Sequence, residues 1–417
     1  MLNGVLFIAF TFAHYIVGYQ GPSNRLTRHL LKQHEKCAPP DGVVVITHEM
    51  ELVHIHTVDE LKQTMIALVY VVEEWDDPTL SWDPTNFSGL RVTWLPEEAI
   101  WVPDIIVFNM LNHQELLHSV RSPVRVQYTG RVTFSYPAIY SVMCRIGIAQ
   151  FPFDSQTCEL RIASWGYGEE KLRLNATRKP YLQHYSPNEE WALHNVSIRQ
   201  DHYDHEGVVV SEARYVVVIA RKPFYYLISL VLPSYIICML SIAGLFARFS
   251  TKHERQERFT LGVTAILSMA VLSLVVTEKV PHSSEGVPLL VVYFHYNIIM
   301  VTLATILTSI VMRVHSRGTA SKSSPPPKWL LRYLFIRKAE FGPPSVSGGK
   351  NAANWTRQLV AEQWAEISRR MDYIMALVFL IIVTSPTVYL FVVCFLSEDV
   401  AQERALLAGS RESMHRV

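Results

Sequence analysis

The sequence lacks an excess of charge of either sign. Its 38 Lys and Arg residues nearly balance 37 Asp and Glu residues, which leaves a formal net charge of +1 at pH 7. A strongly basic chain would indicate nucleic acid as a partner, and nothing here does so. The sequence also lacks a Ser/His/Asp arrangement, a phosphate-binding loop or a metal-spacing motif in a credible context. We therefore expect no nucleic-acid partner, no enzymatic activity, no metal and no cofactor.

Long uncharged runs are missing between residues 21 and 222. That part is mixed and rich in charged and turn residues, although the mean hydropathy of the whole chain is +0.15. The apolar residues are concentrated in four later segments, each near the roughly 20 residues with which a helix crosses a bilayer. These segments are Phe224–Phe246, Phe259–Val276, Val287–Met312 and Tyr373–Leu396. We predict a soluble domain followed by a membrane domain of four helices.

The ends and connections of the chain predict its orientation. Residues 1–20 are apolar and indicate a cleaved signal peptide; because no Lys or Arg precedes the apolar core, a buried N-terminal helix is the alternative. The connection between the third and fourth spans is rich in Lys and Arg, which places it in the cytoplasm. The predicted order is signal peptide (1–20), extracellular domain (21–221), three transmembrane helices (222–313), cytoplasmic loop (314–372), fourth transmembrane helix (373–396) and extracellular tail (397–417).

Shorter patterns refine this plan. The extracellular part carries glycosylation sequons at Asn86, Asn175 and Asn195, whereas a fourth at Asn354 lies inside and should stay unmodified. Residues 328–338 of the cytoplasmic loop form a basic amphipathic pattern. From about Asn354 a helical pattern runs without a breaker into the fourth span, so we expect one continuous helix there.

Cysteine is scarce, with five residues in the chain. Cys238 and Cys394 fall in membrane segments, where a thiol is usually a small apolar group. Cys37 stands alone. Cys144 and Cys158 are the closely spaced pair of the soluble half, and a secreted context would oxidise them.

The second span has a stripe of distinctive residues along one helical face. Residues at alternating three- and four-residue steps occupy it: Glu257, Thr260, Thr264, Leu267, Val271, Leu274 and Glu278. On several subunits around an axis, the glutamates would form acidic rings that attract cations, and the Leu267 and Val271 levels a constriction that closes by dewetting. In the alternative interpretation, the threonines bond to their own helix backbone and the glutamates mark the ends of the span.

The segment from Cys144 to Cys158, with its central Phe151-Pro-Phe-Asp154, resembles the signature loop of Cys-loop receptors. Around it, in the family's order, stand Trp101-Val-Pro-Asp104, Ser164-Trp-Gly-Tyr167 and Arg221-Lys-Pro-Phe-Tyr-Tyr226. The second span and its flanks are similar to nicotinic acetylcholine receptor subunits. The resemblance covers residues 45–394. It implies an extracellular all-β, immunoglobulin-like sandwich, an α-helical four-span bundle and a pentamer of homomeric or heteromeric composition. Short β-rich runs separated by turn residues agree with the sandwich.

The resemblance also implies the type of permeant ion. In this family a glutamate at the cytoplasmic end of the pore helix accompanies cation selectivity, and Glu257 occupies that place. Anion-conducting relatives usually carry a Pro-Ala pair there, which this sequence does not have.

Agonists of the family bind between neighbouring extracellular domains, where aromatic rings attract cationic amines. On the principal face the matching positions are Phe108, Trp165 and Tyr203, and on the complementary face Tyr70, with Arg131 and Thr133 as neighbours.

Two departures from the nicotinic α pattern place acetylcholine in question. The loop holding Tyr203 has no adjacent cysteines, and Val210 takes the place of its second tyrosine. Histidines and acids at residues 201–206 of this loop suggest protons or zinc as another trigger, because imidazoles titrate near neutral pH and bind zinc beside carboxylates. An exposed, solvated loop tip is the alternative.

The family places the coupling elements at the membrane face of the extracellular domain. They are the loop with Glu60, the tip formed by Phe151, Pro152, Phe153 and Asp154, and the linker beginning at Pro281. Arg221, just before the first span, is expected to pair with acids such as Glu60.

The leading hypothesis is a ligand-gated, cation-selective channel subunit of the plasma membrane, in a postsynaptic location or elsewhere, opened by a small cationic amine. The alternatives are a proton- or zinc-gated channel, or an accessory subunit that requires a heteromeric partner. The expected partners are four further subunits, a small-molecule agonist, membrane lipids and permeant cations.

Overall fold

The computed structural model describes residues 21–114, 122–177, 182–247, 254–279, 286–319, 325–327, 330 and 350–414. The predicted signal peptide, Pro281 and nearly all of the predicted amphipathic helix at 328–338 lie outside the described residues. The chain divides into two compact units. The β unit comprises Met1–Gly147 and Ser155–Arg221, and the helical unit comprises Ile148–Asp154 and Lys222–Val417.

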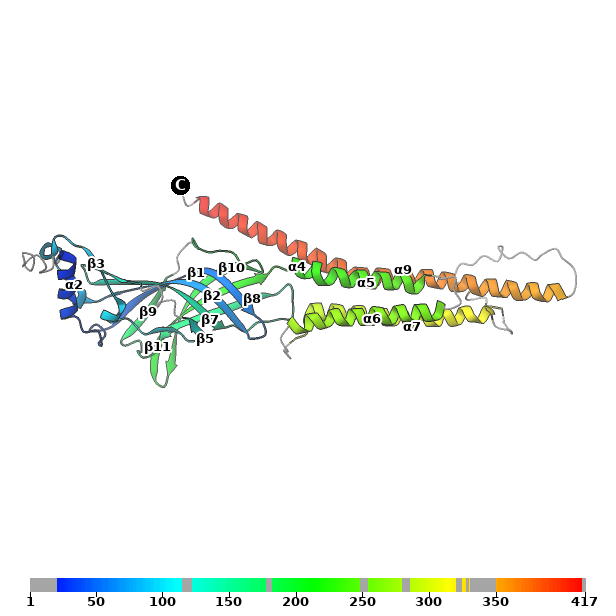
Figure 1. Ribbon diagram of the computed structural model, residues 1–417, viewed down its shortest axis with the longest axis horizontal. Helices are drawn as coiled ribbons and strands as arrows, with labels where there is room; N and C mark the ends of the chain where they lie inside the picture. Colours follow the sequence, from blue (N-terminus) through cyan, green and yellow to red (C-terminus); the bar gives the residue numbers. More distant parts are fainter. Residues whose placement is uncertain are drawn as a thin grey trace, which may run out of the picture. The chain divides into compact units, whose positions relative to one another are not determined.

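The β unit is built from two sheets (Figure 1). Its first sheet has seven strands in the order β3-β6-β7-β2-β1-β9, with β5 paired to β7, and its second has four in the order β10-β11-β8-β4. The strands are β1 (Val44–Asp59), β2 (Thr64–Asp76), β3 (Val92–Leu95), β4 (Ile105–Val107), β5 (Met110–Gln114), β6 (Val124–Gln127), β7 (Arg131–Met143), β8 (Ser155–Ser164), β9 (Leu172–Thr177), β10 (Trp191–His205) and β11 (Val208–Arg221).

Alternation of buried and accessible side chains explains why these segments form a sandwich. Along β7, Val132, Phe134 and Tyr136 are buried while the residues between them are accessible. A strand with one apolar face must cover that face, and two such sheets stacked together cover each other. The predicted all-β sandwich is confirmed.

A short helix precedes the sheets and was not predicted from the sequence. It is α2 (Pro22–Gln33), and its buried side chains are Leu26 and Leu30. It packs against the 3-10 turns η1 (Pro78–Leu80) and η2 (Pro84–Phe87). Pro22 at the first helical position and leucines four residues apart are the signals that could have predicted it.

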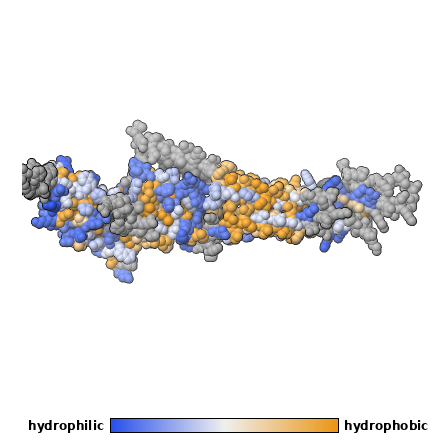
Figure 2. Space-filling view, viewed as in Figure 1, coloured by the Kyte–Doolittle hydropathy of each residue, from blue (hydrophilic) through white to orange (hydrophobic). Residues whose placement is uncertain are grey.

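The helical unit holds the predicted spans. The segments long and apolar enough to cross a membrane are Phe224–Phe246, Glu257–Glu278, Leu289–Arg317 and Gln358–Leu396, so the four-helix prediction is confirmed. Hydrophobic residues dominate the surface over these helices (Figure 2). The elements are α4 (Phe224–Tyr226), η4 (Leu227–Val231), α5 (Leu232–Phe246), α6 (Glu254–Lys279), α7 (Leu289–Thr319) and α9 (Lys350–Met414).

Two of the helices have local features that follow from proline and glycine. In the first span η4 is a π-helical turn that ends just before Pro233. Proline has no N–H to continue the α-helical ladder, and a wider turn accommodates the interruption. Helix α9 is continuous from Lys350, as the sequence predicts, and extends past Leu396 to Met414. The chain between Pro386 and Gly409 contains neither proline nor glycine, so no breaker ends the helix at the predicted position.

Candidate functional site

Three aromatic side chains predicted for one face of a ligand site lie together in the β unit. Phe108 follows β4, Trp165 follows β8 and Tyr203 lies near the end of β10, all in the four-stranded sheet. The ring centroid of Phe108 is 5.7 Å from that of Trp165 and 5.8 Å from that of Tyr203. Trp165 is 73 % exposed, so its ring is available to a ligand or to a neighbouring chain.

The turn that carries Trp165 is fixed by Asp104. The Asp104 side chain accepts hydrogen bonds from the Ser164 hydroxyl and from the Gly166 N–H, both at 2.6 Å. Ser164 in turn accepts from the Tyr167 N–H at 3.0 Å. A Cβ on Gly166 would lie 3.0 Å from the Asp104 carboxylate, which explains the glycine at this close approach. The two motifs Trp-Val-Pro-Asp and Ser-Trp-Gly-Tyr therefore form one structural element.

The hairpin between β10 and β11 carries Tyr203 close to its tip. Glu206 and Gly207 both have positive φ, of 54° and 87°, which is typical of the two central residues of a type I′ turn. Tyr203 is paired with Val210, the residue found where a second tyrosine is expected in nicotinic α subunits. Burial against the sheet raises the pKa of Tyr203, with Glu212 adding to the effect.

The described side chains of the histidine- and acid-rich segment 201–206 pair with neighbouring charged residues. His202 Nδ1 lies 3.2 Å from Glu169 Oε2, and Asp201 pairs with Arg214 at 3.5 Å. The side chain of His205 lies outside the described residues. Among the described residues, no group of three or more potential ligands could hold a metal ion.

Tyr70, predicted for the complementary face, is accompanied by two residues that the sequence analysis missed. Its ring centroid is 5.6 Å from that of His184, and the side chain of Tyr70 is 38 % exposed. His184 Nδ1 lies 3.1 Å from Glu51 Oε2, while the His184 N–H donates to Glu51 Oε1 at 3.0 Å. Glu51 is buried and His184 is exposed, so a buried carboxylate contacts an imidazole at the surface of the domain.

Arg131 and Thr133 lie on the same face of the sheet as Tyr70 but further along it. Arg131 pairs with Asp76 at 3.3 Å, and the Thr133 hydroxyl donates to Glu74 at 3.1 Å. Glu74 is four residues from Tyr70 on β2, which corresponds to about 13 Å along a strand. The two residues therefore do not surround the Tyr70 ring directly.

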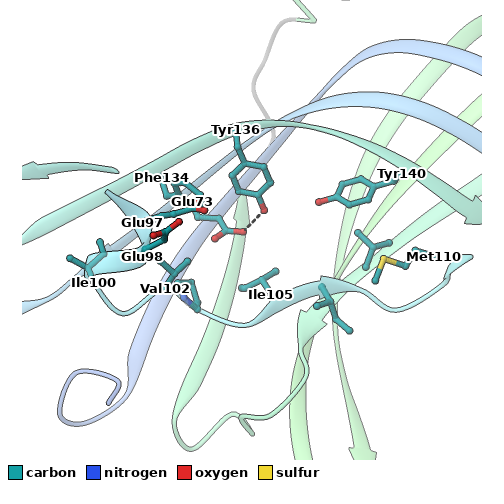
Figure 3. Close-up of a pocket in the computed structure, with 13 residues that line it drawn as sticks. Glu73, Glu97, Glu98, Ile100, Val102, Ile105, Met110, Phe134, Tyr136 and Tyr140 are labelled. Carbon is teal, nitrogen blue, oxygen red and sulfur yellow. Dashed lines mark hydrogen bonds between the residues drawn. The ribbon is translucent and has the colours of Figure 1, made fainter. Parts of the chain in front are cut away.

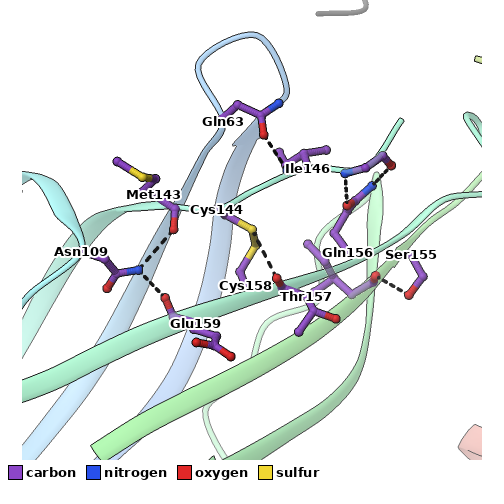
Figure 4. Close-up of a disulfide and its surroundings, with 12 residues drawn as sticks. Gln63, Asn109, Met143, Cys144, Ile146, Ser155, Gln156, Thr157, Cys158 and Glu159 are labelled. Atoms are coloured by element: carbon purple, nitrogen blue, oxygen red, sulfur yellow. Dashed lines mark hydrogen bonds between the residues drawn. A yellow bond between two sulfur atoms is a disulfide. The ribbon is translucent and has the colours of Figure 1, made fainter. Parts of the chain in front are cut away.

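The disulfide Cys144–Cys158 is present, with both cysteines buried (Figure 4). Nearby side chains tie the flanking segments together. The Asn109 amide donates to the carbonyls of Met143 and Glu159 at 3.2 and 2.7 Å. Gln156 accepts from the Gly147 N–H and donates to the Gly147 carbonyl, at 2.9 and 2.8 Å. The loop is therefore anchored by hydrogen bonds as well as by the covalent bond.

The stripe predicted on the second span lies on the uncovered face of α6. All seven of its residues, from Glu257 to Glu278, are exposed in the single chain, with Leu267 at 64 %. The opposite face, which includes Ala265, Met269 and Val276, is buried. The Thr264 hydroxyl donates to the carbonyls of Thr260 and Leu261, both at 3.0 Å. Thr264 therefore makes the bond to its own helix backbone that the alternative interpretation expects, and it is also exposed on the stripe.

Comparison with known families identifies both units. The model of the neurotransmitter-gated ion-channel ligand-binding domain matches residues 23–223, and that of the neurotransmitter-gated ion-channel transmembrane region matches residues 230–341. This chain belongs to the Cys-loop, neurotransmitter-gated ion-channel family. The family consists of pentameric ligand-gated channels, which are not enzymes. The β unit is the ligand-binding domain, and the helical unit makes the chain a multi-pass membrane protein.

Relatives within the family differ in the ligand that their names state. The proton-gated ion channel subunit pbo-6 of Caenorhabditis elegans is 59 % identical over 408 residues, which cover 96 % of this chain and 94 % of that protein. The acetylcholine receptor subunit alpha-type deg-3 of Caenorhabditis elegans is 33 % identical over 76 % of this chain. The neuronal acetylcholine receptor subunit alpha-2 of Mus musculus is 30 % identical over 74 %. The chain spans 58 % and 62 % of the lengths of these two receptor subunits.

Arg221, at the end of the ligand-binding domain, is buried among partners. Its side chain is 0 % exposed and contacts Glu60 and, at 2.7 Å, Glu190. The centre of its guanidinium lies 4.2 Å from the ring centroid of Trp191. The pairing with Glu60 expected from the sequence is present, whereas Glu190 and Trp191 were not foreseen. They follow a polar turn and carry no motif that would single them out.

The tip of the Cys-loop packs within the helical unit. The ring centroid of Phe151 is 5.0 Å from that of Tyr226, in the first span. The N–H groups at the start of α7 donate to the tip, from Leu289 to the Ala149 carbonyl at 3.2 Å and from Leu290 to the Phe151 carbonyl at 3.3 Å. Phe151 of the tip thus contacts the first span through its ring and the third through its carbonyl. The coupling role expected for Phe151, Pro152, Phe153 and Asp154 stays a prediction.

A buried ion pair that was not predicted from the sequence joins α6 to α9. Arg258 Nη1 lies 3.5 Å from Asp372 Oδ1, and both side chains are at most 5 % exposed. The pair lies one residue after Glu257 in the sequence.

The three predicted glycosylation sites, Asn86, Asn175 and Asn195, are exposed in the ligand-binding domain. Their modification stays a prediction.

Proposed function

We propose that this chain is a subunit of a proton-gated, cation-selective channel of the plasma membrane. The observation that carries the proposal is the 59 % identity to a subunit named as proton-gated, which extends over 96 % of this chain. Similarity of that extent includes the ligand-binding domain, the pore helix and the connections between them. The acetylcholine receptor subunits are similar at 30–33 % identity and over a smaller part of the chain.

The chemistry of the predicted agonist site supports a trigger other than acetylcholine. The hairpin that carries Tyr203 lacks adjacent cysteines and has Val210 as the partner of Tyr203. On the complementary face, the exposed imidazole of His184 lies between the buried carboxylate of Glu51 and the ring of Tyr70. A protonated imidazole in that position is itself a cation beside an aromatic ring, which is the interaction a bound amine would otherwise provide.

Cation selectivity is supported by the pore helix. Glu257 and Glu278 lie at opposite ends of the exposed stripe on α6, and three apolar levels lie between the threonines and Glu278. Five such helices around an axis would present acidic rings at both mouths. The family's assembly supplies the remaining four subunits, which are either copies of this chain or related chains.

The test is electrophysiological. The chain is expressed in oocytes, alone and together with related subunits of the family, and exposed to extracellular pH steps. We expect inward current on acidification, with a reversal potential that follows the cation gradient and not the chloride gradient. Surface-expressed channels that stay closed to acid in every combination would refute proton gating, and a reversal potential that follows chloride would refute the assigned selectivity.

An amine-gated channel is the second candidate, and one observation favours it. The ring centroids of Trp165 and Tyr203 each lie within 5.8 Å of that of Phe108, an arrangement suited to cation–π contact with a small amine. A panel of small amines applied at constant neutral pH distinguishes the two candidates. Current evoked by an amine without acidification favours the second, and current evoked by acid alone favours the first. Zinc as a trigger gains no support from the described residues, which contain no three-ligand cluster.

A further inference from the structure

A cavity of about 460 Å³ lies within the ligand-binding domain, and none of Tyr70, Phe108, Trp165 and Tyr203 lines it (Figure 3). One wall is formed by β2 and β7, and the other by the 3-10 turn η3 (Glu97–Ala99) and the segment through β4 to Met110. The ionisable residues among its thirteen lining residues are Glu73, Glu97, Glu98, Tyr136 and Tyr140, and none of the lining residues is basic. The cavity is therefore acidic and contains no side chain that could neutralise a carboxylate.

Glu73 is the most deeply placed of these acids. It is 2 % exposed, and its carboxylate accepts a hydrogen bond from the Tyr136 hydroxyl at 3.0 Å (Figure 3). Tyr136 is hydrogen-bonded in turn to Tyr140. Glu98 is exposed and Glu97 is partly so, which leaves Glu73 as the carboxylate of the cavity that has little water to stabilise its charge.

The groups that face Glu73 from neighbouring strands do not supply a positive charge either. On β1 the position directly opposite is His48, whose Nδ1 lies 2.9 Å from the Tyr215 hydroxyl of β11. Burial lowers the pKa of His48 to about 4, so this imidazole is neutral near neutral pH. Tyr215 stays neutral as well, because burial raises its pKa far above the neutral range.

Burial has the opposite effect on Glu73. It raises the pKa of this carboxyl from 4.5 to about 7, and the hydrogen bond from Tyr136 reduces the shift only in part. Mild acidification from neutral pH therefore changes the protonation state of Glu73. The His184 side chain, by contrast, is 58 % exposed and is not buried inside the sandwich as Glu73 is.

We propose that Glu73 is the proton-binding site of this channel, with Tyr136 positioning its carboxylate, and that its protonation promotes opening. This inference rests on the proposed proton gating. A proton activates a channel only if it binds the active state more tightly than the resting state. Neutral Glu73 needs no water and allows the two sheets to close on the cavity, whereas ionised Glu73 favours a looser, hydrated interior.

The position of the cavity connects it to both faces of the predicted agonist site. Glu73 lies on β2, three residues after Tyr70. On the other wall Val107 lines the cavity and directly precedes Phe108. Closing the cavity moves two strands that carry residues of the complementary and principal faces, so protonation inside the sandwich can act where an agonist would act at the surface.

The test compares proton responses of full-length channels in a subunit combination that conducts. Glu73→Gln removes the titrating group, and we expect the acid-evoked change in current to fall at least about tenfold, with surface expression retained. Glu74→Gln, on the next residue and the opposite face of β2, is the matched control and should respond as the wild type does. A wild-type response in Glu73→Gln would overturn the proposal.

A second variant gives a directional prediction that poor folding cannot imitate. Tyr136→Phe removes the donor that stabilises ionised Glu73, so the half-activating pH should move upward by about one unit. Unchanged or lower half-activating pH in Tyr136→Phe, with normal surface expression, would contradict the assigned site.

An infrared titration of the purified channel separates this inference from the function on which it rests. As the pH falls from about 8 to about 6, a protonated carboxylic acid band should appear in the wild type, because the raised pKa of Glu73 lies in that range. The band should be missing in Glu73→Gln. If that band titrates but acid opens no current, Glu73 binds protons and proton gating is wrong. If acid opens the wild-type channel and the variant shows the same band, proton gating stands and Glu73 is not the site.

Discussion

In the ligand-binding domain the distinctive ionisable residues lie in the interior, whereas in the membrane unit the distinctive stripe lies on the surface. His48, Glu73 and Arg221 are all at most 5 % exposed. On α6 the residues from Glu257 to Glu278 that form the stripe are all exposed in the single chain. These three residues of the first unit find their partners within one chain, whereas the stripe of the second unit is uncovered in the single chain.

The difference shows that the two units tune charge by different physical means. In the β unit, burial and a few fixed partners determine whether a group is charged. In the helical unit, the proposed pore stripe would gain its effect by repetition around an axis, because each acid would be reinforced by the same acid on neighbouring subunits. Substitutions should accordingly act through stability and proton affinity in the first unit, and through ion permeation in the second.

The largest effect is expected for Glu257, on the exposed stripe of α6, and it concerns ion selectivity. Glu257→Ala removes one carboxylate from every subunit at the same level of the pore, so the cation-to-anion permeability ratio should fall about tenfold or more. Reversal potentials in sodium chloride gradients measure the ratio. Glu189→Ala, which removes an exposed acid of the ligand-binding domain, is the control and should leave it unchanged. An unchanged ratio in Glu257→Ala would show that the filter lies elsewhere.

A smaller but still substantial effect is expected at buried Arg221. Arg221→Ala leaves Glu60 and Glu190 without their shared cation and exposes the Trp191 ring, a loss of about 3–5 kcal/mol for a buried pair. We expect reduced surface expression and a lower thermal unfolding midpoint. Arg199→Ala, at an exposed position of β10, serves as the control. Arg221→Lys should be intermediate, since it keeps the charge but loses the forked contact with both acids. Wild-type stability of the alanine variant would contradict this account.

The smallest effect concerns the contribution of buried His48 to stability. Its dependence on pH is opposite in sign to that of buried Glu73. Because burial lowers its pKa from 6.5 to about 4, the unfolded chain binds a proton more readily than the folded one in that range. Stability from neutral His48 is complete above pH 6.5 and is lost as the pH falls toward 4, by about 3 kcal/mol at most. Glu73 has the opposite sign, since its contribution is complete below pH 4.5 and is lost as the pH rises through about 7.

Thermal unfolding midpoints between pH 7.5 and 4.5 test these signs. His48→Gln keeps a side chain that can hydrogen-bond to Tyr215 but cannot titrate, so acidification should lower its midpoint less than that of the wild type. His56→Gln, at an exposed position of the same strand, should behave as the wild type does. Equal acid sensitivity of the His48 variant and the wild type would contradict the assignment.

The sequence allowed the architecture to be predicted because its signals are local. Four apolar runs, a helical stripe on the second span and the motif between Cys144 and Cys158 are each visible within a short segment. The aromatic residues Phe108, Trp165 and Tyr203 were brought together only by the family resemblance, since they come from three separate strands. Periodicity alone gives no sign that these positions meet.

The missed residues depend on contacts between distant parts of the chain. His184 and Glu51 are 133 positions apart, and Arg258 and Asp372 are 114 apart. Glu73 looks like any glutamate on a strand until the second sheet is placed over it, because burial and not the residue type alters its proton affinity. Helix α2 differs, because its signals are local: Pro22, Leu26 and Leu30 lie directly after the apolar segment that is predicted to be cleaved.

The assignment of Ile148–Asp154 to the helical unit has a consequence for exchanging parts between channels. A chimaera joined after Arg221 would combine one protein's membrane helices with another protein's loop tip. The hydrogen bonds from Leu289 and Leu290, and the contact between Phe151 and Tyr226, would then join surfaces that had not evolved together. A functional graft of this ligand-binding domain requires a discontinuous splice, in which the recipient channel keeps its own seven residues between Gly147 and Ser155.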